Sequence, residues 1–366
     1  MSFLNRLCYN KDKMVLQKNP NKRQAIHLIY GNVELFNVAE AVAVPGRAGV
    51  LLQRIPESVR SRLRDASQRQ YRQASGVELR FVNERGPAQI TLASYRGSVQ
   101  AYLYFGNFAA GSFTVTEEPT AIECALPSPH FLFRDDFHGS DYPFSPRVVR
   151  LLFKGGEVHL LKAQGEGLRP PLPSELPKLR YMAYGTSITQ GDASGLSYVN
   201  QTAWRLLADA LNLGASGTAY CEPELADYMA KRDDWNIASL CISVNMLNQG
   251  VSGEEFQAKA RYMVRTIAER NPDKPLVCIG LFPSFHDLGY SWPNRIHAST
   301  ADEYRSILRD IAADPLLQNT HYIDGQELLT SFNGLSHDLL HPSDQGMIEI
   351  GEHLAKFMRK LICRSM

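Results

Sequence analysis

The chain has 366 residues, of which 44% are hydrophobic and 21% are charged, and its formal net charge is +1. This composition is that of an ordinary globular protein long enough for two domains, and the near-zero charge argues against a nucleic-acid partner or an anionic membrane surface. No apolar run approaches the ~20 residues that a membrane-spanning helix needs, and the N-terminus lacks the apolar segment and cleavage site of a signal peptide.

Six cysteines are scattered along the chain, with no C-x-x-C pair among them. Cys241 and Cys278 lie inside apolar runs, where a reduced thiol behaves as a small hydrophobic group. This pattern favours a reducing compartment over a disulfide framework. We therefore predict a cytoplasmic protein.

The first half of the sequence is typical of antiparallel β-structure. Short runs rich in β-branched and aromatic residues are separated by turn residues, and several of them alternate in polarity, as half-buried strands of a sandwich do. One helix is predicted over residues 56–74, with Pro56 near its first turn. The predicted strands are 24–31, 77–83, 89–95, 99–105, 112–115 and 158–161.

A proline-rich segment separates the two halves of the chain. Between Pro170 and Pro177 there are four prolines in eight residues, which neither a helix nor a central strand accommodates. We predict an N-terminal domain over residues 1–166, a stiff linker over 167–178 and a C-terminal domain over 179–366.

The second half alternates between strand and helix patterns. Such alternation implies βαβ crossovers and a mostly parallel sheet with helices on both faces. The predicted strands are 179–185, 238–245, 275–282 and 321–324, with a short strand or turn at 212–217, and the predicted helices are 198–211, 223–231, 253–270, 301–313 and 344–361.

The segment Tyr184–Gly191, which reads YGTSITQG, follows the first predicted strand of this half. Ser187 therefore lies at the carboxyl edge of the sheet, where open α/β sheets bind their ligands. The segment is not the nucleophile elbow of α/β-hydrolases, because Thr189 stands where that motif has its second glycine. Taken alone, it fits either a nucleophilic serine or a serine that caps a helix.

The segment His337–Pro342, which reads HDLLHP, precedes the last predicted helix. An aspartate three residues before a histidine can hydrogen-bond the imidazole, fix its tautomer and stabilise its protonated form. Asp338 and His341 therefore suit the acid–base part of a catalytic triad. A surface turn that happens to contain both residues is also open, as is a metal site, although no third ligand lies at a recognisable spacing.

Two further segments follow neighbouring strands, NLGASG at residues 212–217 and SVNM at 243–246. In a sheet ordered 2-1-3-4-5 the topological switch point lies between strands one and three, so Ser187 and Asn245 would flank it. The Ser187 N–H, the Gly217 N–H and the Asn245 side chain could then hold a tetrahedral oxyanion. Each residue taken singly also fits a turn or a strand-end cap.

Together these four segments resemble the SGNH hydrolases, also called GDSL esterases, whose blocks supply serine, glycine, asparagine and histidine in this order. The resemblance covers about residues 179–361 and is to the branch of the family with an N-terminal β-sandwich. It implies an α/β fold with a flavodoxin-like, three-layer α/β/α catalytic domain around a parallel sheet. An all-β, jelly-roll-like sandwich would precede that domain.

The resemblance also implies roles for individual residues. Ser187 would be the nucleophile and would share the oxyanion hole with Gly217 and Asn245, while Asp338 and His341 would complete the triad. Two blocks depart from the family pattern: the first reads Gly-Thr-Ser rather than Gly-Asp-Ser, and the third reads SVNM rather than G-x-N-D.

His286, in the segment FPSFHD after the fourth predicted strand, is a rival base at the same edge of the sheet. It has no aspartate at a triad-forming spacing, so we predict a substrate-binding role for it. An ordinary surface loop remains open as well.

On this resemblance we predict a serine carboxyl-ester hydrolase that removes short acyl groups, acetyl above all, from a carbohydrate or similar small polyol. No metal or organic cofactor, nucleic acid or membrane is expected to take part, and a homo-oligomer is left open. An acyltransferase with the same triad is the first alternative. A carbohydrate-binding protein with an inactive hydrolase half is disfavoured, because no triad member is missing.

Overall fold

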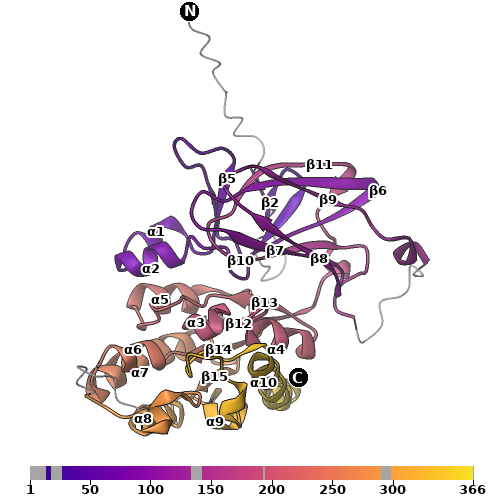
Figure 1. Ribbon diagram of the computed structural model, residues 1–366. Helices are drawn as coiled ribbons and strands as arrows, with labels where there is room; N and C mark the ends of the chain where they lie inside the picture. The colour runs from indigo at the N-terminus through magenta and orange to yellow at the C-terminus, as the bar shows by residue number, and fades with distance from the viewer. Residues whose placement is uncertain (1–13, 18–26, 133–141, 193, 290–297, 366) are drawn as a thin grey trace, which may run out of the picture.

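The computed structural model describes residues 14–17, 27–132, 142–192, 194–289 and 298–365. Figure 1 shows a β-rich N-terminal half stacked on an α/β C-terminal half. The predicted fold class, an all-β sandwich followed by an α/β domain, is confirmed.

In the described part of the N-terminal half, eleven strands form an antiparallel array. Its longest strand, β6 (Glu78–Ala93), contributes to both layers, because its first part pairs with β3 (Val33–Phe36) and β10 (Val149–Gly155) and its second part with β9 (Thr120–Cys124). Strand β11 (His159–Arg169) pairs with β6 along its length. The other strands are β1 (Met14–Gln17), β2 (His27–Tyr30), β4 (Glu40–Val42), β5 (Val50–Gln53), β7 (Val99–Phe105) and β8 (Phe108–Val115).

The helix predicted over 56–74 is wrong as one element, because the structure has two short helices there. These are α1 (Glu57–Arg60) and α2 (Asp65–Gln70). Between them Arg64 takes an extended backbone, and its N–H donates to the Glu222 carboxylate at 2.8 Å. The chain bends there because it docks on the C-terminal half.

Two other N-terminal predictions differ in extent. The strands expected at 77–83 and 89–95 are one continuous strand, β6. Strand β11 runs to Arg169, three residues into the predicted linker, and a single 3₁₀ turn at Pro173–Glu175 follows. The exact domain boundaries stay a prediction.

Over the residues described in the C-terminal half, a parallel sheet of five strands runs in the order β13-β12-β14-β15-β16. In chain order this is the predicted 2-1-3-4-5 arrangement. The strands are β12 (Leu179–Gly185), β13 (Ala208–Asn212), β14 (Ile237–Cys241), β15 (Leu276–Ile279) and β16 (Thr320–Ile323).

Helices cover both faces of this sheet. Figure 1 shows α4 (Tyr198–Leu206) and α10 (Asp344–Ser365) on one side, and α5 (Pro223–Lys231), α7 (Gly253–Arg270) and α8 (Ala301–Ala312) on the other. Helix α4 packs against α10, and α7 packs against both α5 and α8. None of the described helices is long and apolar enough to cross a membrane.

Two predicted elements of this half are corrected. The helix expected to run to residue 211 ends at Leu206, because Leu207 adopts a left-handed conformation with φ of 56°, and residues 208–212 then pair with β12 as a strand. The strand expected to run to residue 245 ends at Cys241, and a short helix, α6 (Val244–Asn248), follows. Asn245 is therefore on a helix and not at a strand end.

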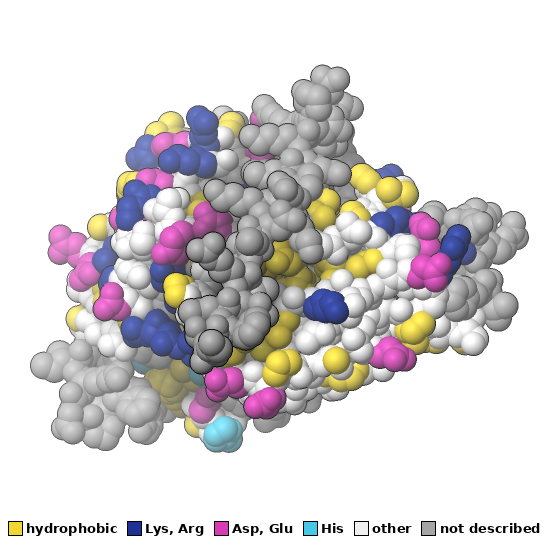
Figure 2. All heavy atoms as spheres, turned by 90° about the horizontal axis from the view of Figure 1, so that it is seen from above, with side chains coloured by type: hydrophobic (Ala, Val, Ile, Leu, Met, Phe, Trp, Pro, Cys, Tyr) yellow, Lys and Arg dark blue, Asp and Glu magenta, His cyan; other side chains and the backbone are white. Residues whose placement is uncertain are grey.

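The face of the N-terminal half seen from above carries charges of both signs. Figure 2 shows Lys and Arg side chains interspersed with Asp and Glu around a band of hydrophobic side chains. Such a mixed surface creates no single-sign field over the described part of this face.

The two halves share buried contacts of two kinds. Five side chains of the N-terminal half belong to the hydrophobic core of the C-terminal half, namely Phe36, Ile55, Val59, Leu63 and Tyr71. Across the same interface the Arg80 guanidinium, which has no exposed surface, donates to the Asp209 carboxylate at 2.8 Å and to the Glu78 carboxylate at 2.8 Å.

This buried ion pair makes a testable prediction about stability. Asp209→Ala removes the one carboxylate that pairs with the buried Arg80 from the C-terminal half and leaves it Glu78 and Glu34 of its own half, so we expect the free energy of unfolding to fall by about 3–5 kcal/mol, as measured by urea denaturation. Glu166→Ala is the matched control, because Glu166 pairs with Arg85 at 3.0 Å with both side chains more than 70% exposed, and its loss should cost no more than about 1 kcal/mol. Equal effects of the two variants would contradict the expectation.

Candidate active site

Ser187 is the first residue of α3 (Ser187–Gln190), two residues after the end of β12. The helix is capped by Thr186, whose Oγ1 accepts a hydrogen bond from the Ile188 N–H at 3.3 Å. Capping therefore does not explain Ser187. Its hydroxyl, on a residue only 6% exposed, lies 2.7 Å from Nε2 of His341, which is 154 residues further along the chain.

His341 ends the tight turn predicted from the HDLLHP segment. Its Nδ1 lies 2.6 Å from the Asp338 carboxylate, and its backbone N–H donates to the same carboxylate at 2.9 Å. Leu339 closes the turn in a left-handed conformation with φ of 56°. With Nδ1 donating its proton to Asp338, Nε2 is free to accept the Ser187 hydroxyl proton.

Asp338 is held in its ionised form. Burial raises its pKa, but hydrogen bonds from the His341 side chain, from the His341 and Leu340 backbone and from the Ser336 hydroxyl outweigh burial and hold the pKa well below its usual range. Ser336, which lies two residues before Asp338, was not predicted from the sequence. A carboxylate of this kind keeps the imidazole in one tautomer at neutral pH.

The two other predicted oxyanion donors lie in adjoining segments. Asn245 Oδ1 accepts a hydrogen bond from the Ala219 N–H at 3.1 Å, which leaves its Nδ2 to donate elsewhere. Gly217 has φ of 67°, a conformation that favours glycine. Among the described residues, none accepts a hydrogen bond from the backbone N–H of Gly217 or of Ser187. Their roles in an oxyanion hole stay a prediction.

The loop that carries Gly217 is attached to the helix of Ser187. The Gln190 side chain, at the end of α3, accepts a hydrogen bond from the Ser216 N–H at 2.9 Å. A Cβ placed on Gly214 would fall 2.4 Å from the Gln190 nitrogen, so the loop and the helix are in close contact. Gln190 was not predicted to belong to the site, because only the fold reveals its partner.

His286 does not join the hydrogen bonds of Ser187, His341 and Asp338. Its Nε2 lies 2.7 Å from Oδ1 of Asn248, and its ring lies against Phe285 with ring centres 4.4 Å apart. The Phe285 N–H donates to the Leu339 carbonyl at 2.8 Å, which ties this segment to the turn of His341. The substrate-binding role of His286 stays a prediction.

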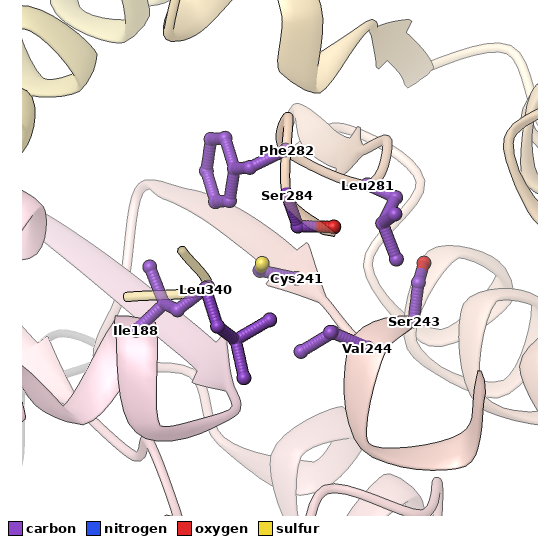
Figure 3. Close-up of a pocket in the computed structure, with 8 residues that line it drawn as sticks. All are labelled: Ile188, Cys241, Ser243, Val244, Leu281, Phe282, Ser284 and Leu340. Atoms are coloured by element: carbon purple, nitrogen blue, oxygen red, sulfur yellow. The ribbon is translucent and has the colours of Figure 1, made fainter. Parts of the chain in front are cut away.

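Figure 3 shows a small pocket whose wall includes Ile188, Val244 and Leu340, which are the chain neighbours of Ser187, Asn245 and His341. It is mostly apolar, and the hydroxyls of Ser243 and Ser284 lie among its side chains. It has room for about one water molecule, so it is too small to hold an acyl chain. The lining residues are Ile188, Cys241, Ser243, Val244, Leu281, Phe282, Ser284 and Leu340.

Within the described part of the chain, no three His, Cys, Asp or Glu side chains gather as a set of metal ligands. The arrangement of Ser187, His341 and Asp338 instead provides a hydroxyl, a base in contact with it and a carboxylate that orients the base. That combination suits nucleophilic attack on an acyl carbon.

Comparison with known proteins places this geometry in context. Residues 183–347 match the model of the GDSL-like lipase/acylhydrolase family, a span that contains all five residues predicted for the triad and the oxyanion hole. None of the curated protein sequences searched matches the chain.

Several solved structures share the fold over both halves of the chain. The salicylyl-acyltransferase SsfX3 from a tetracycline biosynthetic pathway has a TM-score of 0.69 at 18% identity, and the match covers 95% of this chain and 97% of that one. A family two carbohydrate esterase from Cellvibrio japonicus has a TM-score of 0.56 at 15% identity, over 80% and 90% of the two chains. The acetyl xylan esterase Est2A from Butyrivibrio proteoclasticus has a TM-score of 0.52 at 11% identity, over 88% and 96%.

Proposed function

Since the C-terminal domain belongs to the GDSL-like lipase/acylhydrolase family, and the protein is thus an enzyme of the esterase class, we propose that it is a serine carboxyl-ester hydrolase with Ser187 as nucleophile. The observation that carries the proposal is the chain of two hydrogen bonds from Ser187 Oγ to His341 Nε2 at 2.7 Å and from His341 Nδ1 to Asp338 at 2.6 Å.

The first half of the proposed reaction forms an acyl-enzyme. His341 Nε2 takes the Ser187 hydroxyl proton while Oγ attacks the ester carbonyl carbon, and Asp338 stabilises the resulting imidazolium. The Ser187 and Gly217 N–H groups and the Asn245 amide donate hydrogen bonds to the oxyanion. The tetrahedral intermediate then breaks its bond to the alcohol, which leaves with the proton from His341.

The second half of the proposed reaction repeats these steps with water. His341 accepts a proton from water as the oxygen attacks the acyl carbon, a second oxyanion forms in the same place, and the Ser187 oxygen leaves and regains its proton. The acid is released, and no atom of the enzyme is altered. The cycle requires no metal or organic cofactor.

We propose short acyl groups, acetyl above all, on a carbohydrate or similar small polyol. One observation supports this. The two-domain fold is shared with a family two carbohydrate esterase and an acetyl xylan esterase.

A series of p-nitrophenyl esters tests this proposal. We expect kcat/KM for p-nitrophenyl acetate to exceed that for the octanoate at least about tenfold, with the butyrate between them, because each methylene that finds no room costs about 1–3 kcal/mol. Diethyl p-nitrophenyl phosphate should attach to Ser187, as located by peptide mass spectrometry.

Three outcomes would be decisive against parts of the proposal. A preference for octanoate would contradict a short acyl group, and labelling at a residue other than Ser187 would contradict the nucleophile. With glycerol present, an acylated glycerol in place of free acid would show that the enzyme transfers its acyl group to an alcohol rather than to water.

A further inference from the structure

The loop that leads to Gly217 is held by side chains of the N-terminal half. Three consecutive carbonyl groups precede Gly217 in this loop, at residues 212, 213 and 214, and each accepts a hydrogen bond from a different N-terminal side chain. The donors are Asn37 Nδ2 to the Asn212 carbonyl (2.9 Å), the Tyr71 hydroxyl to the Leu213 carbonyl (3.2 Å) and Arg54 Nη1 to the Gly214 carbonyl (2.7 Å).

Arg54 has the most unusual setting of the three. It has no exposed surface, and its guanidinium donates to the Gly214 carbonyl on one side and to the Gln70 and Gln73 carbonyls, at 2.8 and 2.9 Å, on the other. Among the described residues, no carboxylate lies within 4.0 Å of its guanidinium nitrogens. Burial lowers the pKa of Arg54 to about 10, so the group is still charged at neutral pH.

A buried cation whose hydrogen bonds all go to carbonyls is costly to a fold, because carbonyl dipoles replace water less fully than a carboxylate does, and the Tyr71 ring, 5.2 Å from the guanidinium, offsets only part of that cost. An apolar side chain would fill the same space without that cost. What Arg54 supplies instead is a rigid set of donors that joins the end of α2 to the loop before Gly217.

A second connection closes a ring of contacts around the loop. The Gln190 Nε2 of α3 donates to Oε1 of Gln73 at 2.9 Å, while its Oε1 accepts from the Ser216 N–H at 2.9 Å. Gln73 in turn accepts from Arg54 through its backbone carbonyl. The helix of Ser187, the loop of Gly217 and the N-terminal half are thus joined through one set of hydrogen bonds.

From this arrangement, and resting on the proposed function, we propose that Arg54 is a positioning residue that fixes loop 212–217 so that the Gly217 N–H faces the oxyanion formed on Ser187. Tyr71 assists Arg54 through the hydrogen bond from its hydroxyl to the adjacent Leu213 carbonyl. The N-terminal half is then part of the catalytic apparatus, although none of its residues touches the reacting atoms. Since an oxyanion hole acts on the transition state, loss of this support lowers kcat and leaves KM largely unchanged.

The test uses two substitutions in the full chain, Arg54→Lys and Tyr71→Phe, with p-nitrophenyl acetate as substrate. Release of p-nitrophenol reports formation of the acyl-enzyme, whichever acceptor follows. We expect kcat to fall about 10- to 100-fold for Arg54→Lys and about 3- to 10-fold for Tyr71→Phe, with KM within about threefold of the wild type. The shape of the kcat–pH profile should not change, because the bonds among Ser187, His341 and Asp338 are untouched.

Tyr304→Phe is the matched control for Tyr71→Phe. Both tyrosines are fully buried and both hydroxyls donate to a backbone carbonyl, but Tyr304 bonds Val251, far from loop 212–217 in the sequence and on the α8 side of the sheet. Tyr304→Phe should lower the melting temperature as Tyr71→Phe does, with kcat within about twofold of the wild type.

The positioning role is overturned if Arg54→Lys and Tyr71→Phe are folded and keep kcat within about threefold of the wild type, or if only KM changes. Should Arg54→Lys fail to fold, Tyr71→Phe against Tyr304→Phe decides the question. Ser187→Ala, assayed in parallel, separates the two proposals, because turnover retained in that variant contradicts the proposed function itself.

Discussion

Replacing either Ser187 or His341 with alanine is expected to lower kcat for ester hydrolysis about 10⁶-fold, and replacing both is expected to lower it no further. The Ser187 hydroxyl and His341 Nε2 lie 2.7 Å apart and exchange one proton during the reaction. Neither side chain can therefore contribute to catalysis when the other is replaced. Residual catalysis would come from the oxyanion donors and from substrate binding, which both variants keep. The measurement is p-nitrophenol release by the two single variants and the double variant.

His337→Ala is the control for His341→Ala. His337 is exposed and lies four residues before His341, at the start of the same turn, and no described hydrogen bond joins it to Ser187 or Asp338. Its removal should leave kcat within about twofold of the wild type, as is usual for surface substitutions away from a site. If the double variant instead lost the product of the two single effects, Ser187 and His341 would act independently and the triad would be wrong.

The parts of the site that sequence could predict are those set by local spacing and by sheet topology. Asp338 and His341 are three residues apart, so their contact needs only a turn. Ser187 and Asn245 follow strands one and three, which the 2-1-3-4-5 order makes neighbours. A three-residue spacing was enough for the contact of Asp338 with His341, and a recognisable strand–helix alternation was enough to bring Ser187 and Asn245 to neighbouring strands.

The contacts that hold the Gly217 loop could not be predicted in this way. Arg54 and Gly214 are 160 residues apart and belong to different halves of the chain. No periodicity in the sequence predicts that an arginine after β5 will donate to a carbonyl after β13. The same limit explains the error over residues 208–212. The predicted helix 198–211 included Asp209, which is instead buried in β13, where Arg80 of the N-terminal half donates to its carboxylate at 2.8 Å. A prediction that assigns every polar residue to the surface is wrong where a second domain buries that residue and supplies its hydrogen-bond partner.

Asp338→Asn should lower kcat about 10⁴-fold with the protein still folded. An asparagine at this position presents an amide N–H to Nδ1 of His341, which favours the tautomer with its proton on Nε2 and so removes the acceptor for the Ser187 proton. The measurement is kcat for p-nitrophenyl acetate at several pH values. Any fall in the kcat of the wild type between neutral pH and about pH 4 should not come from protonation of Asp338, because the pKa of Asp338 is held well below the usual value of about 3.9.

The same shift gives a signed prediction for stability. A carboxyl group whose pKa is lower in the folded than in the unfolded state stabilises the fold above the unfolded value of about 3.9, and this contribution is lost as the pH falls below it. The melting temperature of the wild type should therefore exceed that of Asp338→Asn at pH 7, and the difference should shrink at pH 3. The difference will be modest, since the Asp338 side chain is 37% exposed and solvent screens it. A difference that grew toward low pH would mean that the hydrogen bonds to His341, Leu340 and Ser336 do not favour the ionised carboxylate, and the electrostatic basis of the triad would fail with them.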